Sequence, residues 1–206
     1  MCGRYSLGVG IPDDNIQTII QMCNSHSDDA HKISVNISGD ICPADNAPVL
    51  MVANRKVTAV SMSWGIASVG NKLIINARSE DLRQRPMFRG IADTQRCIIP
   101  AAGYYEWRDH DKLRHKITAE SDKPIFFAGL YQSDARGQLH FVILTRAAID
   151  EHSKIHSRMP CILFNREETR EWLSGSMSPE KLTLHPASGL KIEVQGNEQM
   201  SMFFDD

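Results

Sequence analysis

A succession of short apolar segments, separated by turns, most constrains the fold of this 206-residue chain. Seven of them follow one another after residue 71, and two more flank the turn "NRK" at residues 54–56. The segments are 48–53, 57–64, 72–78, 96–100, 103–108, 115–120, 124–132, 139–146 and 158–164. Their lengths and their branched and aromatic residues are typical of β-strands. Consecutive strands with short turns predict an α+β fold built on a curled, barrel-like, largely antiparallel sheet.

Helices are expected only at the margins of this sheet. Residues 13–23 place apolar side chains at helical spacing behind Pro12, which predicts one helix. Asn165 and Glu168 have the spacing of a capping box and predict a second, short helix through "REWL" at 170–173. Because no repeat or linker divides the chain, we expect a single domain over residues 1–206.

The charge of the chain is unevenly distributed. The formal net charge is −2 and the isoelectric point is near 6.4, so composition alone indicates no polyanionic partner. Residues 72–116, however, carry ten Lys and Arg side chains against six Asp and Glu. This segment is a basic patch on an acidic body, and the sequence leaves open whether it is a binding surface or an ordinary solvated face.

The number and spacing of cysteines and histidines indicate the redox compartment of the protein and whether it binds a metal. Five scattered cysteines without a C-x-x-C pair predict free thiols in a reducing compartment. His152 and His156 form an H-x-x-x-H pair, but no third ligand stands at a suggestive spacing, so we expect no metal and no other cofactor. No apolar run reaches the length of a membrane span, and residues 1–25 lack the pattern of a signal peptide. The expected location is therefore the cytoplasm.

Four short stretches place a reactive or polar residue two positions before an arginine. In an extended segment, residues i and i+2 point to the same face, so each pair offers a chemical group beside an anion-binding fork. The pairs are Cys2 with Arg4, Asn76 with Arg78, Glu106 with Arg108, and His156 with Arg158.

Five motifs carry a resemblance to a known family. "MCGRY", "SWGI", "INARSE", "RCIIPAAGYYEW" and "IHSRMPCIL" occur in the order and approximate spacing of the SOS-response-associated peptidase (SRAP) family. The resemblance is clear over residues 1–173 and weak over 174–206. It implies a single β-rich domain that crosslinks to abasic sites in single-stranded DNA, with Cys2, Asn76, Glu106 and His156 as the site. A protein with this target is expected at the nucleoid when it acts on DNA.

The chemistry of the first residues fits this implication. Once Met1 is removed, which a small second residue permits, Cys2 carries an α-amine and a thiol on adjacent carbons. The amine, with an ordinary pKa near 8, can attack an aldehyde to form an imine. The thiol can then add to the imine carbon and close a five-membered thiazolidine. The sequence leaves a second interpretation open, in which Cys2 is a small buried residue without reactivity.

Three further residues are candidates for moving protons and positioning the sugar. Glu106 lies between Tyr105 and Trp107, and partly apolar surroundings raise the pKa of a carboxyl toward neutrality. His156 is the expected second proton carrier, assisting the opening of the sugar ring. Asn76, with a donor and an acceptor but no charge, is the expected positioning residue. For Glu106 and His156 a purely structural role stays open.

Single-stranded DNA needs phosphate contacts and a surface that stacks on or wedges between bases. The candidates for phosphate contact and for close approach of the backbone are Gly3, Arg4, Arg78 and Arg158. "PMFRG" resembles the wedge of the family and contributes the candidates Met87, Phe88 and Arg89. Met87 and Phe88 are equally compatible with a place in the core.

The sequence thus predicts a covalent sensor of abasic sites in single-stranded DNA, acting as a monomer and shielding the lesion by a thiazolidine crosslink. Two alternatives come from other classes. A thiol peptidase would use Cys2 with His156 as its base, although no oxyanion arrangement accompanies the thiol. A non-covalent reader of single-stranded or modified DNA would need the basic segment but not Cys2.

Overall fold

The computed structural model describes residues 2–8, 19, 23, 39–68, 70, 72–121, 123–184, 186 and 188–195. Strands make up 46% of the structure and helices 17%, which confirms the predicted β-rich α+β fold. Of the helix predicted over 13–23, all but Ile19 and Cys23 lies outside the described residues. Within the described part of the chain, no helix is long and apolar enough to cross a membrane.

The larger sheet closes on itself. Its strands, in order, are β13 (Arg158–Pro160), β12 (Leu139–Ala147), β4 (Lys56–Trp64), β3 (Asn46–Ala53), β8 (Arg96–Ala101), β11 (Ile125–Ser133) and β14 (Ile162–Leu163). An additional pairing between β11 and β12 joins the two ends of the β12-β4-β3-β8-β11 path into a barrel. β7 (Asn76–Arg78) pairs with β12, and the contacts of β12 with β7 and β4 are the parallel ones.

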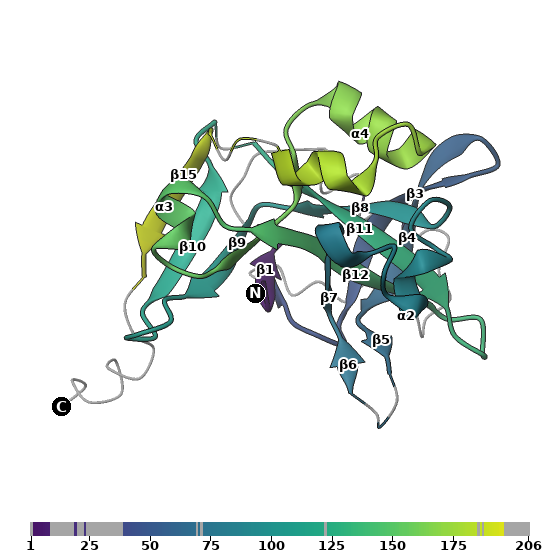
Figure 1. Cartoon of the computed structure of the whole chain (residues 1–206), viewed down its shortest axis with the longest axis horizontal. Helices are drawn as coiled ribbons and strands as arrows, with labels where there is room; N and C mark the ends of the chain where they lie inside the picture. The colour runs from purple at the N-terminus through teal and green to yellow at the C-terminus, as the bar shows by residue number, and fades with distance from the viewer. Residues whose placement is uncertain are drawn as a thin grey trace.

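A second sheet has five strands, in the order β15 (Leu190–Val194), β10 (Arg114–Ala119), β9 (Gly103–Trp107), β1 (Arg4–Ser6) and β2 (Asp40–Ile41). All of its pairings are antiparallel. The short strands β5 (Ile66–Ala67) and β6 (Leu73–Ile74) form a separate hairpin. Figure 1 shows the five-stranded sheet beside the barrel, with β1 between β9 and the barrel.

The helical segments whose bounds the structure describes are short and peripheral, as predicted. They are η1 (Ser79–Asp81), α2 (Pro86–Arg89), α3 (Asp150–Ser153), α4 (Arg166–Ser174) and η2 (Pro179–Leu184). The predicted capping box is confirmed, because Asn165 Oδ1 accepts a hydrogen bond of 2.9 Å from the backbone N–H of Glu168. The predicted β3–β4 hairpin is also confirmed. Its turn uses Asn54 and Arg55 with φ of 51° and 63°, the left-handed pair that a tight hairpin requires.

An aromatic cluster holds the N-terminal strand between the two sheets. Tyr5 of β1 is fully buried and meets Trp64 and Phe127 edge-on, at ring centroid distances of 5.2 and 5.9 Å. Tyr104 of β9 packs against Phe127 in the same way, at 5.8 Å. Such pairs add stability beyond the burial of area, so they fix β1 and the residues just before it.

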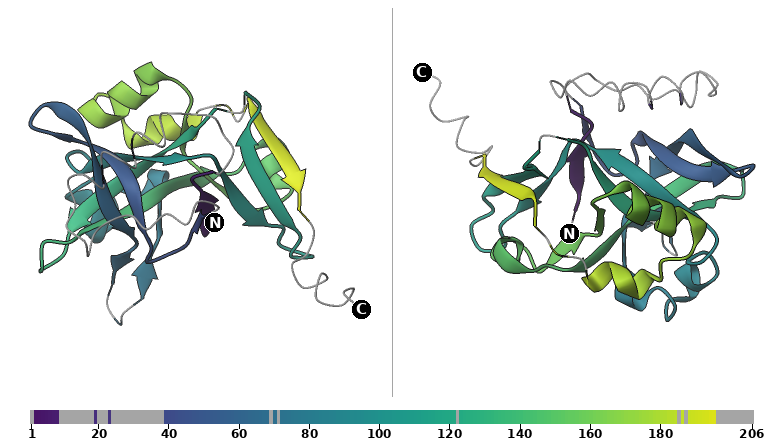
Figure 2. Two further views of the ribbon diagram at one scale, coloured as in Figure 1. Left: turned by 180° about the vertical axis from the view of Figure 1, so that it is seen from behind. Right: turned by 90° about the horizontal axis from the view of Figure 1, so that it is seen from above.

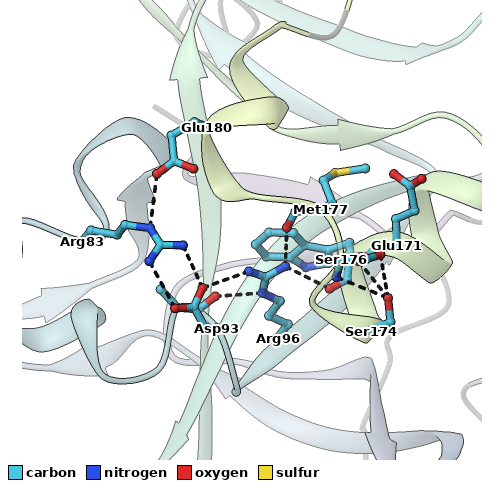
Figure 3. Close-up of polar contacts among 10 residues, drawn as sticks. Arg83, Asp93, Arg96, Glu171, Ser174, Ser176, Met177 and Glu180 are labelled. Atoms are coloured by element: carbon cyan, nitrogen blue, oxygen red, sulfur yellow. Dashed lines mark hydrogen bonds and ion pairs between the residues drawn. The ribbon is translucent and has the colours of Figure 1, made fainter.

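A buried arginine ties the C-terminal helices to the outside of the barrel. The guanidinium of Arg96 lies 4.2 Å from the ring centre of Trp172 and donates to the carbonyls of Ala92 at 2.8 Å and Met177 at 2.6 Å. Asp93 supplies a counter-charge at 3.3 Å and also pairs with the exposed Arg83 (Figure 3). These contacts compensate the charge of the buried guanidinium. Because they link Arg96 of β8 to Trp172 of α4, they fix the position of α4 against β8.

Candidate functional site

The four residues predicted to form the site come from four separate segments. Cys2 lies two residues before the start of β1, Asn76 begins β7, Glu106 lies in β9, and His156 stands between α3 and β13. Figure 1 shows β1 beside β9, with which it pairs. The side-chain amide of Asn76 donates a hydrogen bond of 2.7 Å to the carbonyl of Cys2. The structure therefore brings β7 to the N-terminal segment, where Glu106 also acts on the Cys2 thiol.

The thiol of Cys2 is a buried, protonated group. Cys2 has no exposed surface, and its sulfur lies 3.8 Å from the carbonyl oxygen of Arg4. Burial raises the pKa of the Cys2 thiol well above its ordinary value, and the neighbouring Glu106 raises the pKa further. The thiol is therefore neutral at pH 7, which suits a second-stage addition better than it suits direct attack as a thiolate.

The carboxyl of Glu106 is poised near neutrality. Glu106 is only 5% exposed, and burial raises its pKa to about 7. The positive charge of the amino terminus acts in the opposite direction and lowers the pKa of Glu106, whereas Asp109 adds to the rise. A carboxyl with this pKa can both accept and donate a proton at pH 7.

His156 is held as a neutral ring. The backbone N–H of Arg158 donates a hydrogen bond of 2.9 Å to Nδ1 of His156. The ring proton therefore lies on Nε2, which is 3.9 Å from a carboxylate oxygen of Asp109. Burial lowers the pKa of His156, and the positive amino terminus lowers it further. At pH 7 the ring thus presents one N–H donor at Nε2.

Asn76 has one amide atom engaged and one open. The parallel pairing of Asn76 with Ile143 of β12 sets the register of β7 and therefore the position of Asn76 beside Cys2. The oxygen Oδ1 is buried and has no hydrogen-bond partner in the part of the chain that the structure describes. A buried amide oxygen without a partner is costly, so Asn76 presents an acceptor that an incoming donor satisfies.

The predicted phosphate-binding residues differ in how available they are. Arg78 is 55% exposed and stands 3.7 Å from Asp81. Arg4 lies 3.7 Å from Asp40 and 5.4 Å from the ring centre of Trp107. Ion pairs of this length are weak, so neither pair by itself holds its guanidinium in a fixed geometry. Gly3 is half-buried between Cys2 and Arg4.

Arg158 is engaged more firmly than the other two arginines. Its guanidinium makes a two-pronged contact with the carboxylate of Glu80 and donates 2.7 Å to the carbonyl of Thr145. Only 12% of its side chain is exposed. Two-pronged Arg–carboxylate pairs are among the stronger ionic contacts, so a phosphate would have to displace Glu80.

The three wedge candidates differ in their exposure to solvent. Phe88 is 3% exposed and belongs to the apolar cluster on the outer face of the barrel, against which Met87 packs half-buried. Arg89, the last residue of α2, is exposed. Phe88 therefore has the environment of a core residue, which is one of the two interpretations that the sequence left open.

Sequence reasoning missed two residues of the site. The hydroxyl of Tyr104 is buried without a partner among the described residues, and its pKa is raised by burial and then by Cys2 and Glu106. Its position two residues before Glu106, on the same face of β9, was a usable signal. Asp109 approaches both His156 and Glu106 from the turn after β9, and no sequence pattern indicates that approach.

Comparison with known proteins places the chain in a family. The family described as "SOS response associated peptidase (SRAP)" matches residues 1–196. The chain belongs to this family. The match continues beyond residue 173, where the recognisable motifs end.

Curated relatives carry a common description. The chain is 30% identical over 192 residues to "Abasic site processing protein YobE" of Bacillus subtilis, covering 84% of this chain and 82% of the relative. It is 32% identical over 160 residues to "Abasic site processing protein YedK" of Escherichia coli, covering 73% and 70%.

Solved structures share the fold. A crystal structure of a protein from Bacteroides thetaiotaomicron superposes with a TM-score of 0.74 at 20% identity, covering 97% of this chain and 94% of that one. A phage-related protein of Bordetella bronchiseptica gives a TM-score of 0.68 at 21% identity, covering 94% and 93%. At this level of identity the similarity concerns the fold.

Proposed function

We propose that this SRAP protein processes abasic sites in single-stranded DNA by forming a thiazolidine crosslink through Cys2. The observation that carries the proposal is the convergence of Asn76 and Glu106 on the N-terminal cysteine. The curated relatives are named abasic site processing proteins, and an abasic sugar exposes an aldehyde when its ring opens. A 1,2-aminothiol next to a proton-carrying carboxyl is suited to that aldehyde.

The reaction proceeds in two balanced steps after removal of Met1. The neutral α-amine of Cys2 attacks the aldehyde carbon, and loss of one water from the carbinolamine leaves an imine. The thiol sulfur then adds to the imine carbon while the thiol proton ends on the nitrogen, closing the ring. Glu106 accepts the proton that the amine loses and returns a proton to the departing oxygen, which its pKa of about 7 allows.

His156 and Asn76 orient the sugar in this proposal. The Nε2–H of the neutral His156 donates a hydrogen bond to the ring oxygen and so favours ring opening. We infer a hydrogen-bond donor rather than a charged acid, because the bond from Arg158 occupies Nδ1. The open Oδ1 of Asn76 accepts from the amine or from a sugar hydroxyl.

The two alternative functions have less support. A thiol peptidase would need the Cys2 thiolate beside a basic histidine, but burial keeps the thiol protonated and its sulfur contacts a backbone carbonyl. Non-covalent binding of DNA would not require a buried carboxyl such as Glu106 beside Cys2.

Denaturing gels separate the three functions. The protein is incubated with an abasic oligonucleotide, an intact oligonucleotide of the same sequence, and a denatured protein substrate. We expect a slow-migrating adduct with the abasic strand alone. Cleavage of the protein substrate without an adduct would support the peptidase, and binding that disappears on denaturation would support the reader.

DNA binding should depend on Arg4 and Arg78 more than on Arg158. If Arg4 and Arg78 each neutralise one phosphate, log affinity should fall against log salt with a slope of about −1.4, from about −0.7 per single-strand phosphate. Arg4→Ala or Arg78→Ala should each flatten the slope by about 0.7. Arg158→Ala should leave the slope unchanged, because Glu80 already neutralises Arg158.

The measurement is a fluorescence titration of each variant at several salt concentrations. Arg136→Ala is the matched control, since this exposed arginine stands in the turn after β11, away from Cys2. Equal slopes in the wild type, Arg4→Ala and Arg78→Ala would contradict the proposed phosphate contacts.

A further inference from the structure

A pocket with a volume of about 820 Å³ opens between α3 and the inner face of β10 and β15. Figures 1 and 2 show these three elements together at the end of the molecule that carries the five-stranded sheet. Its lining includes His115 of β10, His152 of α3, and the apolar side chains Ile155, Leu190 and Ile192. The volume is within the range typical of small-molecule sites.

One buried histidine leaves both ring nitrogens without a partner in this pocket, and a second histidine also lines it. His152 is 7% exposed, and neither ring nitrogen has a partner among the described residues. Burial lowers the pKa of His152, so the ring is neutral and offers one donor and one acceptor. Nδ1 of His115 lies 2.9 Å from the carbonyl of Leu113 and donates to it. The unpartnered nitrogens of the buried His152 ring are costly, and a ligand with a polar edge would satisfy them.

The charges around the pocket do not favour an anion. The positive group of Arg108 is held by Asp111, at 3.0 Å from Nε, and that of Lys154 by Glu151, at 2.8 Å. The lining further includes the acidic Glu120, so none of the described lining residues directs an unpaired positive charge at the pocket. A phosphate is therefore a poor ligand, and a neutral ring with polar edges and apolar faces is a good one.

The pocket begins beside the proposed reaction centre. His115 is the direct cross-strand partner of Glu106, and directly opposed residues point to the same face with their Cβ atoms about 5 Å apart. Ile155, which lines the pocket, directly precedes His156. A nucleotide joined by one phosphate to the sugar at Cys2 would therefore have its base close to the pocket.

We propose that this pocket binds the nucleobase of a nucleotide adjacent to the abasic site, with His152 and His115 contacting the polar edge of the base. The inference rests on the proposed function. It identifies a base-binding subsite for that function. Ile155 and the apolar side chains of β15 cover the faces of the base, and the phosphates stay outside with Arg4 and Arg78.

The test uses probes that cannot crosslink. Three oligonucleotides carry a closed tetrahydrofuran ring in place of the abasic sugar: one with both flanking bases, one without the 5′ base, and one without the 3′ base. Fluorescence polarisation should show that the wild type loses about tenfold in affinity when one particular flanking base is missing, the scale of one good base contact. Loss of the other base should have a small effect.

Two variants of the pocket should abolish this preference. Ser188→Trp places a large ring at the exposed rim, and His152→Phe keeps the ring shape without its nitrogens. Both should bind the complete probe about tenfold more weakly, as weakly as the wild type binds the probe that lacks the preferred base. Ser133→Trp, at the exposed end of β11, is the matched control and should keep the preference.

The outcomes separate the pocket from the crosslink. Equal affinity of the wild type for all three probes would contradict the proposal that the pocket binds a base. A folded Ser188→Trp protein that keeps the preference for one flanking base would also contradict it. Because a tetrahydrofuran ring exposes no aldehyde, neither result depends on Cys2. Absence of an adduct with true abasic DNA would instead overturn the crosslink and leave the base preference measurable.

Discussion

Replacing Cys2 with alanine should abolish the denaturation-resistant adduct with abasic DNA. The α-amine remains in this variant, so an imine can still form, but no sulfur is present to close the ring. Imines hydrolyse on denaturation, and the gel should show free protein and free DNA. Cys42→Ala is the matched control, because it removes another free thiol that is not placed at the N-terminus. It should crosslink like the wild type.

Cys2→Ser and protein with retained Met1 test the two halves of the aminothiol separately. The serine variant has the amine but a much weaker ring-closing nucleophile, so its adduct should survive denaturation only after reduction of the imine with borohydride. Protein with intact Met1, identified by its mass, should form no thiazolidine, because the nitrogen of Cys2 is then an amide and the amine of Met1 has no thiol on the adjacent carbon. Normal crosslinking by either protein would rule out the thiazolidine mechanism.

The fold was largely predictable because its signals are local. The β3–β4 hairpin follows from alternating apolar residues around a turn, and α4 begins at the Asn165–Glu168 pair. Barrel closure was only implied. The contact of β11 with β12 joins hairpin neighbours, but the parallel contact of β12 with β4 joins segments far apart in the chain, and no short pattern encodes it.

Convergence of the site residues could be inferred only through the resemblance to a family. Cys2 and Asn76 are 74 positions apart, and the hydrogen bond between them depends on the pairing of β7 with β12. The partner of Arg158 was likewise hidden, since Glu80 is 78 positions away. Residue type therefore indicated which side chains can bind a phosphate, whereas tertiary pairing decides which of them are available.

Glu106→Gln should slow crosslinking by about 10² to 10⁴ near pH 7, because it removes the carboxyl that exchanges protons with the amine. Burial raises the pKa of Glu106 to about 7, so the wild-type rate should rise with pH until that carboxyl is ionised. In the variant the amine must lose its proton unaided, and the rise should move toward the ordinary amine pKa near 8. The defect should therefore be largest below pH 7 and smallest at pH 9.

His156→Ala should also slow the reaction by about 10² or more, but without moving the pH profile above pH 7. The reason is that the structure holds His156 as a neutral donor, with Nδ1 accepting from the backbone of Arg158 and a lowered pKa caused by burial. His156→Gln keeps an N–H donor of similar reach and should recover part of the rate. His110→Ala changes an exposed histidine in the turn after β9, next to Asp109, and should react like the wild type.

Single-turnover rates on an abasic oligonucleotide from pH 5 to 9 decide between a neutral donor and a charged acid. If His156 acts as an imidazolium, the wild-type rate should fall as the ring loses its proton, His156→Ala should remove that fall, and glutamine should not rescue. If His156 is a neutral donor, glutamine rescues and the alkaline side stays flat. In both cases the adduct should reach the same mass at long times, because Cys2 alone determines the product. Wild-type rates in Glu106→Gln and His156→Ala would contradict the proposed roles of both residues. Cys2 would then react without assistance from either side chain.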